Sequence, residues 1–128
     1  MTRIVMDAFA WIEYFDGTER GMKVAKIIED KENEIFTSLV TVAEIISIAK
    51  RKVFDADEVS LALSALSKMQ EINKSVSVET GLFHAEMKKR EKDFGLADSF
   101  VVIAARQLEA KILTGDPHFK GMKEAVLI

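Results

Sequence analysis

Hydrophobic and polar positions along the first half of the chain predict strands separated by helices. Residues 3–6 form a short run rich in β-branched side chains, and the aromatic-rich residues 8–15 that follow predict a helix or turn. Apolar side chains at helical spacing predict a helix over residues 18–30. Residues 34–37 are then expected to form a second strand, which enters a helix over residues 40–52.

The second half of the chain continues the alternation of helix and strand. An apolar stripe at helical spacing is made by Val59, Ala62, Leu63, Leu66 and Met69. We expect a brief third strand at residues 76–78 and a helix over residues 79–92. A further helix is expected to contain Leu96 and Leu108, and residues 111–114 and 125–127 complete the pattern as a fourth and a fifth strand.

Strands that alternate with helices imply a mainly parallel sheet covered on both faces. The predicted fold is therefore α/β, a three-layer α/β/α sandwich with four to five central strands. The chain shows no internal repeat and no Gly/Ser linker, and it has one proline. We therefore expect residues 1–128 to form a single domain.

The composition excludes several kinds of site and of protein. The 128 residues contain 18 basic and 21 acidic side chains, a net charge of −3, and no cysteine, which excludes disulfides, thiolate metal sites and a cysteine nucleophile. The longest apolar run, residues 100–105, is far shorter than the ~20 residues of a membrane-spanning helix. Asp7 interrupts the N-terminus before the apolar core of a signal peptide could develop, so we expect a cytoplasmic protein without membrane attachment.

Four acids are placed where a parallel sheet would bring them together. Asp7 follows the first strand and Asp116 follows the fourth, so both are expected at the carboxyl edge of the sheet. Glu44 and Asp98 come early in helices that begin near the same edge. Clustered carboxylates repel one another, and cations relieve the repulsion, which predicts bound Mg²⁺ or Mn²⁺.

Each acid also has a purely structural interpretation. Asp7 and Asp98 could serve as helix caps or first-turn charges, and Asp116 could belong to an ordinary turn. Glu44 follows Thr41 by three residues, which is the spacing of a capping box. The four acids favour a functional site because all of them fall at element junctions on one predicted edge.

Four segments of the chain together resemble the PIN-domain ribonucleases, in particular the VapC-type toxins of VapBC toxin-antitoxin pairs. They are, in order, IVMD at 4–7 with WIEYF at 11–15, VAE at 42–44, GLAD at 95–98, and LTGD at 113–116 followed by PHF. The resemblance spans nearly the whole chain, and the segments stand in the family's order on the expected elements.

The resemblance implies a PIN-like fold and metal-dependent endonucleolytic cleavage of RNA, with water activated by bound Mg²⁺ or Mn²⁺. The family's catalytic, metal-binding acids fall on Asp7, Glu44, Asp98 and Asp116, and its usual hydroxyl falls on Thr114. A homodimer and a cognate antitoxin partner are implied as well. One position departs from the pattern: Phe9 stands where the family often has Ser or Asn, so a polar contact that orients Asp7 is missing.

Several other residues leave alternatives open. His118 belongs either to a surface turn or to a phosphate contact at the rim of the site, and no partners support a zinc site with His84. The basic runs at residues 50–52 and 88–90 are either solvated helix ends or phosphate contacts. The aromatic cluster around Trp11 fits the core or an interface better than a platform for RNA bases.

Two other functions compete with a nuclease. A non-catalytic PIN-like module that binds protein or RNA would be expected to have lost one of the acids, and none is missing. A phosphorylatable receiver domain would carry adjacent acids after the first strand and a phosphoacceptor Asp after the third, and neither feature is present.

Overall fold

The structure is a computed structural model that describes all 128 residues. Its strands are β1 (Thr2–Met6), β2 (Asn33–Ser38), β3 (Lys68–Gln70), β4 (Lys111–Thr114) and β5 (Ala125–Leu127). Its helices are α1 (Ala8–Asp16), α2 (Glu19–Glu29), α3 (Leu39–Arg51), α4 (Ala56–Leu66), α5 (Lys74–Arg90) and α6 (Leu96–Leu108), and the 3-10 turn η1 is Pro117–Phe119. None of the helices is long and apolar enough to cross a bilayer.

The five strands form one parallel sheet in the order β3-β2-β1-β4-β5. From β1 the chain proceeds through β2 to β3 at one edge, then returns through α5 and α6 to β4 on the other side of β1. The strand order therefore reverses between β1 and β4, and open α/β sheets bind ligands at such a point, beyond the carboxyl ends of the strands. The register pairs Met6 with Leu113, which brings the residues after both strands together.

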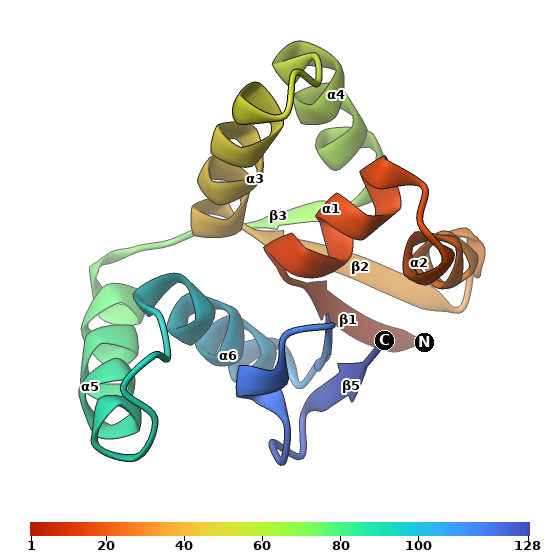
Figure 1. Ribbon diagram of the computed structural model, residues 1–128. Helices are drawn as coiled ribbons and strands as arrows, with labels where there is room; N and C mark the ends of the chain where they lie inside the picture. Colours follow the sequence, from red (N-terminus) through yellow and green to blue (C-terminus); the bar gives the residue numbers. More distant parts are fainter.

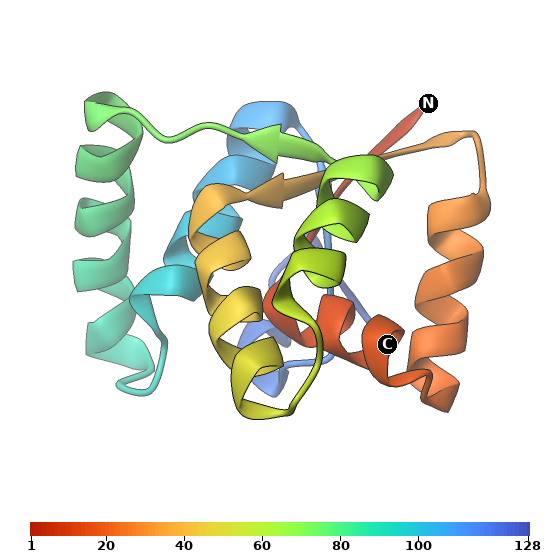
Figure 2. The ribbon, with the colours of Figure 1, turned by 90° about the horizontal axis from the view of Figure 1, so that it is seen from above.

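Helices cover both faces of the sheet (Figure 1), as the sequence predicts. Helices α1 to α4 lie on one face and α5 and α6 on the other, and Figure 2 shows α5 and α2 at opposite sides of the molecule. Side chains alternate between the two cores, since Ile4 and Met6 pack under α1 to α4 whereas Val5 packs against α6. The three-layer α/β/α prediction is confirmed.

Trp11 anchors the first core layer. Its side chain is fully buried, and its indole Nε1–H donates to Thr37 Oγ1 over 3.1 Å. The ring stacks on Phe15 with centroids 5.8 Å apart and meets Tyr14 edge-on at 5.9 Å. Trp11 is therefore a core residue and offers no surface on which an RNA base could stack.

The predicted third strand is wrong in position. Residues 76–78 lie in α5, which begins at Lys74 because Asn73 caps it, accepting a hydrogen bond from the Val76 amide at 2.9 Å. The third strand is instead β3, in which Met69 pairs with Thr37 of β2. The apolar stripe that predicts a helix up to Met69 therefore runs past the end of α4 into this strand.

Gly21 marks the closest approach of α2 to α1. A Cβ atom there would lie 2.0 Å from the Glu13 carbonyl oxygen, a backbone atom that cannot rotate away. We expect Gly21→Ala to lower the free energy of unfolding by about 1–3 kcal/mol, measured by chemical denaturation. Gly81→Ala in α5 is the matched control, because its Cβ would meet nothing within 4 Å, and it should be neutral or stabilising. Equal losses for both variants would contradict this close packing.

Candidate functional site

A hollow of about 390 Å³ lies where β1 and β4 end. Its walls come from α1, α3, α6 and the segment that follows β4. The four acids singled out in the sequence all line it: Asp7, Glu44, Asp98 and Asp116. We call this space the acidic hollow; it brings together carboxylates from distant parts of the chain.

Asp7 is held rigidly at the floor of the acidic hollow. It is only 4 % exposed, and its Oδ1 caps α1 by accepting a hydrogen bond from the Ala10 amide at 2.9 Å. Its Oδ2 accepts a hydrogen bond from the buried hydroxyl of Thr114, and the Asp116 amide donates to the same Thr114 oxygen at 2.9 Å. Thr114 thus orients Asp7 and fixes the start of the segment that carries Asp116. The cap predicted as an alternative for Asp7 is present as well, so the two roles are compatible.

Asp116 caps η1 and contacts His118 at the rim. Its Oδ1 accepts the His118 amide hydrogen bond at 2.9 Å and lies 2.9 Å from Nδ1 of the same histidine. The Asp116 carboxylate raises the pKa of His118, which favours the imidazolium form. His118 therefore does more than fill a surface turn, because its ring contacts the Asp116 carboxylate at the rim of the acidic hollow.

Glu44 and Asp98 enter the acidic hollow from the first half of α3 and the first turn of α6. The capping-box interpretation of Glu44 is wrong, since the N-cap of α3 is Ser38 and Thr41 lies inside the helix. Thr41 is buried, and its hydroxyl has no hydrogen-bond partner. Asp98 does occupy the first turn of α6, next to the Gly95 N-cap, as its structural interpretation predicts.

The acids share an unbalanced negative charge. Burial raises the pKa of Asp7 to about 7, and the nearby Asp98 and Asp116 add to that rise. Burial and the neighbouring Asp98 raise the pKa of Glu44, and burial and Asp116 raise that of Asp98. No salt bridge joins any of the four to a lysine or arginine, and Lys52, which lines the hollow, pairs with Asp16 at 2.9 Å.

This donor set fits a hard divalent cation. Carboxylate oxygens are the ligands that Mg²⁺ and Mn²⁺ prefer, and a cation would offset the burial and the mutual repulsion that together raise these pKa values. Asp98 and Asp116 each place a carboxylate oxygen within 4.8 Å of the other and of a ring nitrogen of His118. Asp7 and Glu44 face the same hollow from the other elements.

Phe9 packs against the segment that carries Asp116. It lines the acidic hollow, and a Cβ on Gly115 would lie only 2.2 Å from its Cε1 atom. The Arg20 guanidinium lies 5.7 Å from the centre of the same ring. Phe9 thus makes an apolar contact with Gly115 at the position where the resembled family often has a polar residue, while Thr114 orients Asp7 from the other strand.

We expect Gly115→Ala to destabilise the protein by about 1–3 kcal/mol, because the methyl group collides with the Phe9 ring. Phe9→Ala removes that ring, so the double variant should lose less stability than the two single variants combined. Thermal unfolding of all four proteins gives the coupling energy, expected at about 1 kcal/mol or more. Strict additivity would mean that the two residues do not contact one another.

The sequence missed two acids near the site and left His118 undecided. Glu91 and Asp93, in the connection between α5 and α6, each place a carboxylate oxygen within 4.8 Å of the other and of His118. No spacing in the sequence signals this, since the contact arises only when that connection folds against η1. His84 lies elsewhere, with Nε2 3.0 Å from the Phe94 carbonyl oxygen, so the two histidines form no joint site.

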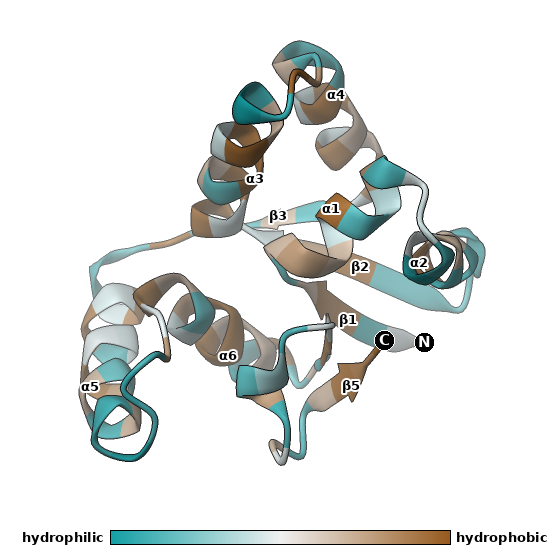
Figure 3. Cartoon of the chain, viewed as in Figure 1, coloured by the Kyte–Doolittle hydropathy of each residue, from teal (hydrophilic) through white to brown (hydrophobic).

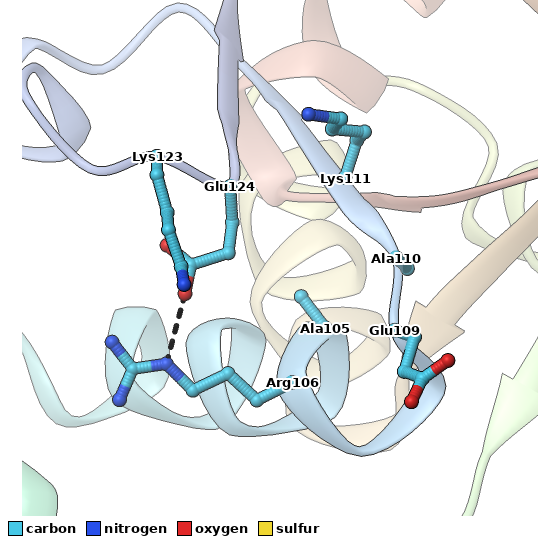
Figure 4. Close-up of a pocket in the computed structure, with 7 residues that line it drawn as sticks. All are labelled: Ala105, Arg106, Glu109, Ala110, Lys111, Lys123 and Glu124. Carbon is cyan, nitrogen blue, oxygen red and sulfur yellow. Dashed lines mark hydrogen bonds and ion pairs between the residues drawn. The ribbon is translucent and has the colours of Figure 1, made fainter.

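Another hollow, of about 570 Å³, lies at the opposite end of the strands (Figure 4). It is formed by the end of α6 and the starts of β4 and β5, including Lys111 and Glu124. Figure 4 shows the ion pair between Arg106 and Glu124. The Arg106 Nε lies 3.0 Å from the Glu124 Oε1. It is separate from the acidic hollow and shares no residue with it.

Several solved structures have a similar fold. VapC20 of Mycobacterium tuberculosis, a sarcin-ricin loop cleaving toxin, is 15% identical with a TM-score of 0.80, and the alignment covers 98% of each chain. A toxin-antitoxin complex from Klebsiella pneumoniae is 21% identical with a TM-score of 0.71, covering 96% of this chain and 95% of that one. DNA-bound VapBC from Salmonella typhimurium is 14% identical with a TM-score of 0.72, covering 100% and 98%.

The resemblance of the sequence to PIN domains is confirmed by a family model. No curated protein matches the sequence. The model of the PIN domain matches residues 4–125, which include all four acids and Thr114. The chain therefore belongs to the PIN domain family.

Proposed function

We propose that this PIN domain is a metal-dependent endoribonuclease and the toxin of a toxin-antitoxin pair. The observation that carries the proposal is the acidic hollow itself, where four carboxylates converge at the switch point of the sheet without a lysine or arginine partner. Support for RNA as the substrate comes from VapC20, a toxin of similar fold that cleaves the sarcin-ricin loop. A receiver domain is not supported, because the family match is to PIN domains.

Five residues carry the proposed chemistry. Asp7, Glu44, Asp98 and Asp116 would hold Mg²⁺ or Mn²⁺, and Thr114 would keep the Asp7 carboxylate in its binding orientation. When bound, such a cation supplies charge that polarises a phosphodiester and promotes ionisation of water near neutral pH. Because Asp7 and Thr114 are buried, their geometry is set before substrate arrives, and no reorganisation is needed during the reaction.

The proposed partners are RNA, a cognate antitoxin and a second copy of the chain. Support for an antitoxin comes from the similar folds found in toxin-antitoxin complexes of Klebsiella pneumoniae and Salmonella typhimurium. Co-expression with the product of a neighbouring short open reading frame, followed by purification, tests for the antitoxin. The homodimer and the cytoplasmic location stay predictions from the sequence.

The proposal is tested by incubating end-labelled total RNA with the purified protein and Mn²⁺. A second sample contains EDTA, and a third contains an identically prepared Asp116→Asn protein to reveal contaminating nucleases. We expect discrete cleavage only by the parent with metal. Cleavage that is equal in all three samples, or absent from all three, would instead favour a non-catalytic PIN-like binding module.

A further inference from the structure

A third hollow lies next to the acidic hollow, beyond the contact between Asp116 and His118. It has a volume of about 490 Å³ and lies between the last turns of α5, the end of α6 and the segment after η1. One wall is apolar and consists of Phe83, Met87 and Met122. We call it the side hollow. His118 lines the side hollow, and its Nδ1 lies 2.9 Å from Oδ1 of Asp116, which lines the acidic hollow.

Two of the cations that line the side hollow have no partner in the protein. Arg90, at the end of α5, and Lys120, after η1, form neither a salt bridge nor a side-chain hydrogen bond. The third, Arg106, pairs with Glu124 (Figure 4) and lies 4.9 Å from the centre of the Phe83 ring. Figure 3 shows that the end of α5 beside this space is hydrophilic. Two free cations therefore flank an apolar wall.

Two acids, Glu86 and Glu91, also line the side hollow. Glu86 pairs with Lys89 at 3.1 Å. Glu91 forms no salt bridge, and its carboxylate lies within 4.8 Å of a ring nitrogen of His118. The three cations Arg90, Arg106 and Lys120 outnumber these two acids, so an anion that enters the side hollow would meet the unpaired charges of Arg90 and Lys120.

We propose that the side hollow binds the nucleotide next to the scissile phosphate of a single-stranded RNA. The unpaired base would lie against Phe83, Met87 and Met122, and its phosphate would contact Arg90 and Lys120. Aromatic rings stack on every base, and arginine binds phosphate oxygens through several donors at once. This inference rests on the proposed function, because it assigns a substrate subsite to the same active site.

Size and position support this assignment. A space of about 490 Å³ falls within the range of ~300–1,000 Å³ that is usual for small-ligand pockets, so it can hold one nucleotide. His118 of the side hollow contacts Asp116 of the acidic hollow, so an RNA bound at the acids would lie close to the side hollow. The sequence left the basic run at residues 88–90 undecided, and the structure separates its members. Lys88 binds the Lys92 carbonyl oxygen at 2.7 Å and Lys89 binds Glu86, whereas Arg90 is free.

The test compares two double variants of equal charge. Arg90→Gln/Lys120→Gln removes the two free cations of the side hollow, and Lys88→Gln/Lys123→Gln removes two lysines that do not line it. Binding of a fluorescein-labelled single-stranded RNA hexamer of random sequence is measured by anisotropy in an Asp98→Asn background, which limits cleavage. Cleavage of the same RNA is measured with Mn²⁺ in the otherwise unaltered protein.

We expect the side-hollow pair to weaken RNA binding about tenfold and to lower the dependence of binding on salt, with the control pair within about twofold of the parent. In cleavage, KM should rise about tenfold for the side-hollow pair while kcat stays within about twofold. Equal RNA binding by the two double variants would overturn the inference even if the parent cleaves RNA. Equal binding is also the result expected if the side hollow serves a protein partner. Selective loss of binding without cleavage by any protein would show that the side hollow binds RNA, and it would overturn both the nuclease and the placement of that RNA next to a scissile phosphate.

Discussion

Replacing Asp7 with Asn is expected to stabilise the metal-free protein at pH 8 by about 2–4 kcal/mol. Burial and two neighbouring carboxylates raise the pKa of Asp7 to about 7, so the ionised side chain destabilises the folded state. Asparagine keeps an oxygen that can cap α1 through the Ala10 amide, and it carries no charge. The gain should be measurable by urea denaturation in EDTA.

The stability that Asp7→Asn adds should increase as the pH rises. The pKa of Asp7 is raised from 3.8 to about 7, so between these values the folded parent binds more protons than the unfolded chain. Its free energy of unfolding therefore falls as the pH rises through this window and levels off above it. The advantage of Asp7→Asn should vanish near pH 4 and be full at pH 8. An advantage that is equal at both pH values would contradict the raised pKa.

Replacing Asp98 with Asn is expected to lower kcat for RNA cleavage by about 10²–10⁴-fold in Mn²⁺. Asp98 places a carboxylate oxygen within 4.8 Å of one from Asp116, so its loss removes a donor from the proposed cation site. The variant should still fold and should be somewhat more stable without metal, because burial and Asp116 raise the pKa of Asp98. Single-turnover cleavage measures the loss.

Glu13→Gln is the matched control for Asp98→Asn. Glu13 also lines the acidic hollow, but its carboxylate accepts a hydrogen bond from the Thr18 hydroxyl and belongs to no cluster of metal-ligating groups. We expect this variant to cleave RNA within about threefold of the parent, as is usual for a surface substitution outside the chemistry. Similar losses for the two variants would show that charge in the hollow matters generally and that Asp98 has no special role.

The sequence predicts the architecture well because most elements carry a strong period. The buried strands β1 and β4 are short apolar runs, and the helices after them begin with recognisable caps such as Asp7. The prediction fails at β3, which has three residues and a largely exposed or half-buried pattern that no period distinguishes. Its place is decided by pairing with β2, a long-range contact that local sequence does not encode.

Part of the site could be predicted from the sequence because the topology of the sheet places two of its acids. Parallel strands that end at one edge bring Asp7 and Asp116 together by topology alone, so the sequence suffices to place them. Other contacts depend on side-chain geometry that only the folded chain shows. These are the hydrogen bonds that join Thr114 to Asp7 and to the Asp116 amide, and the contact of Phe9 with Gly115. The contact of His118 with Asp116, and its place in the side hollow, likewise follow from packing between α5, α6 and η1.

Calorimetric titration of the metal-free protein with Mn²⁺ tests most directly whether the acidic hollow is a cation site. The parent and Glu13→Gln should bind Mn²⁺ with the same Kd, and Asp98→Asn should bind at least about tenfold more weakly, because one carboxylate donor is lost. The same binding by all three proteins, or no binding by the parent, would contradict the proposed metal centre.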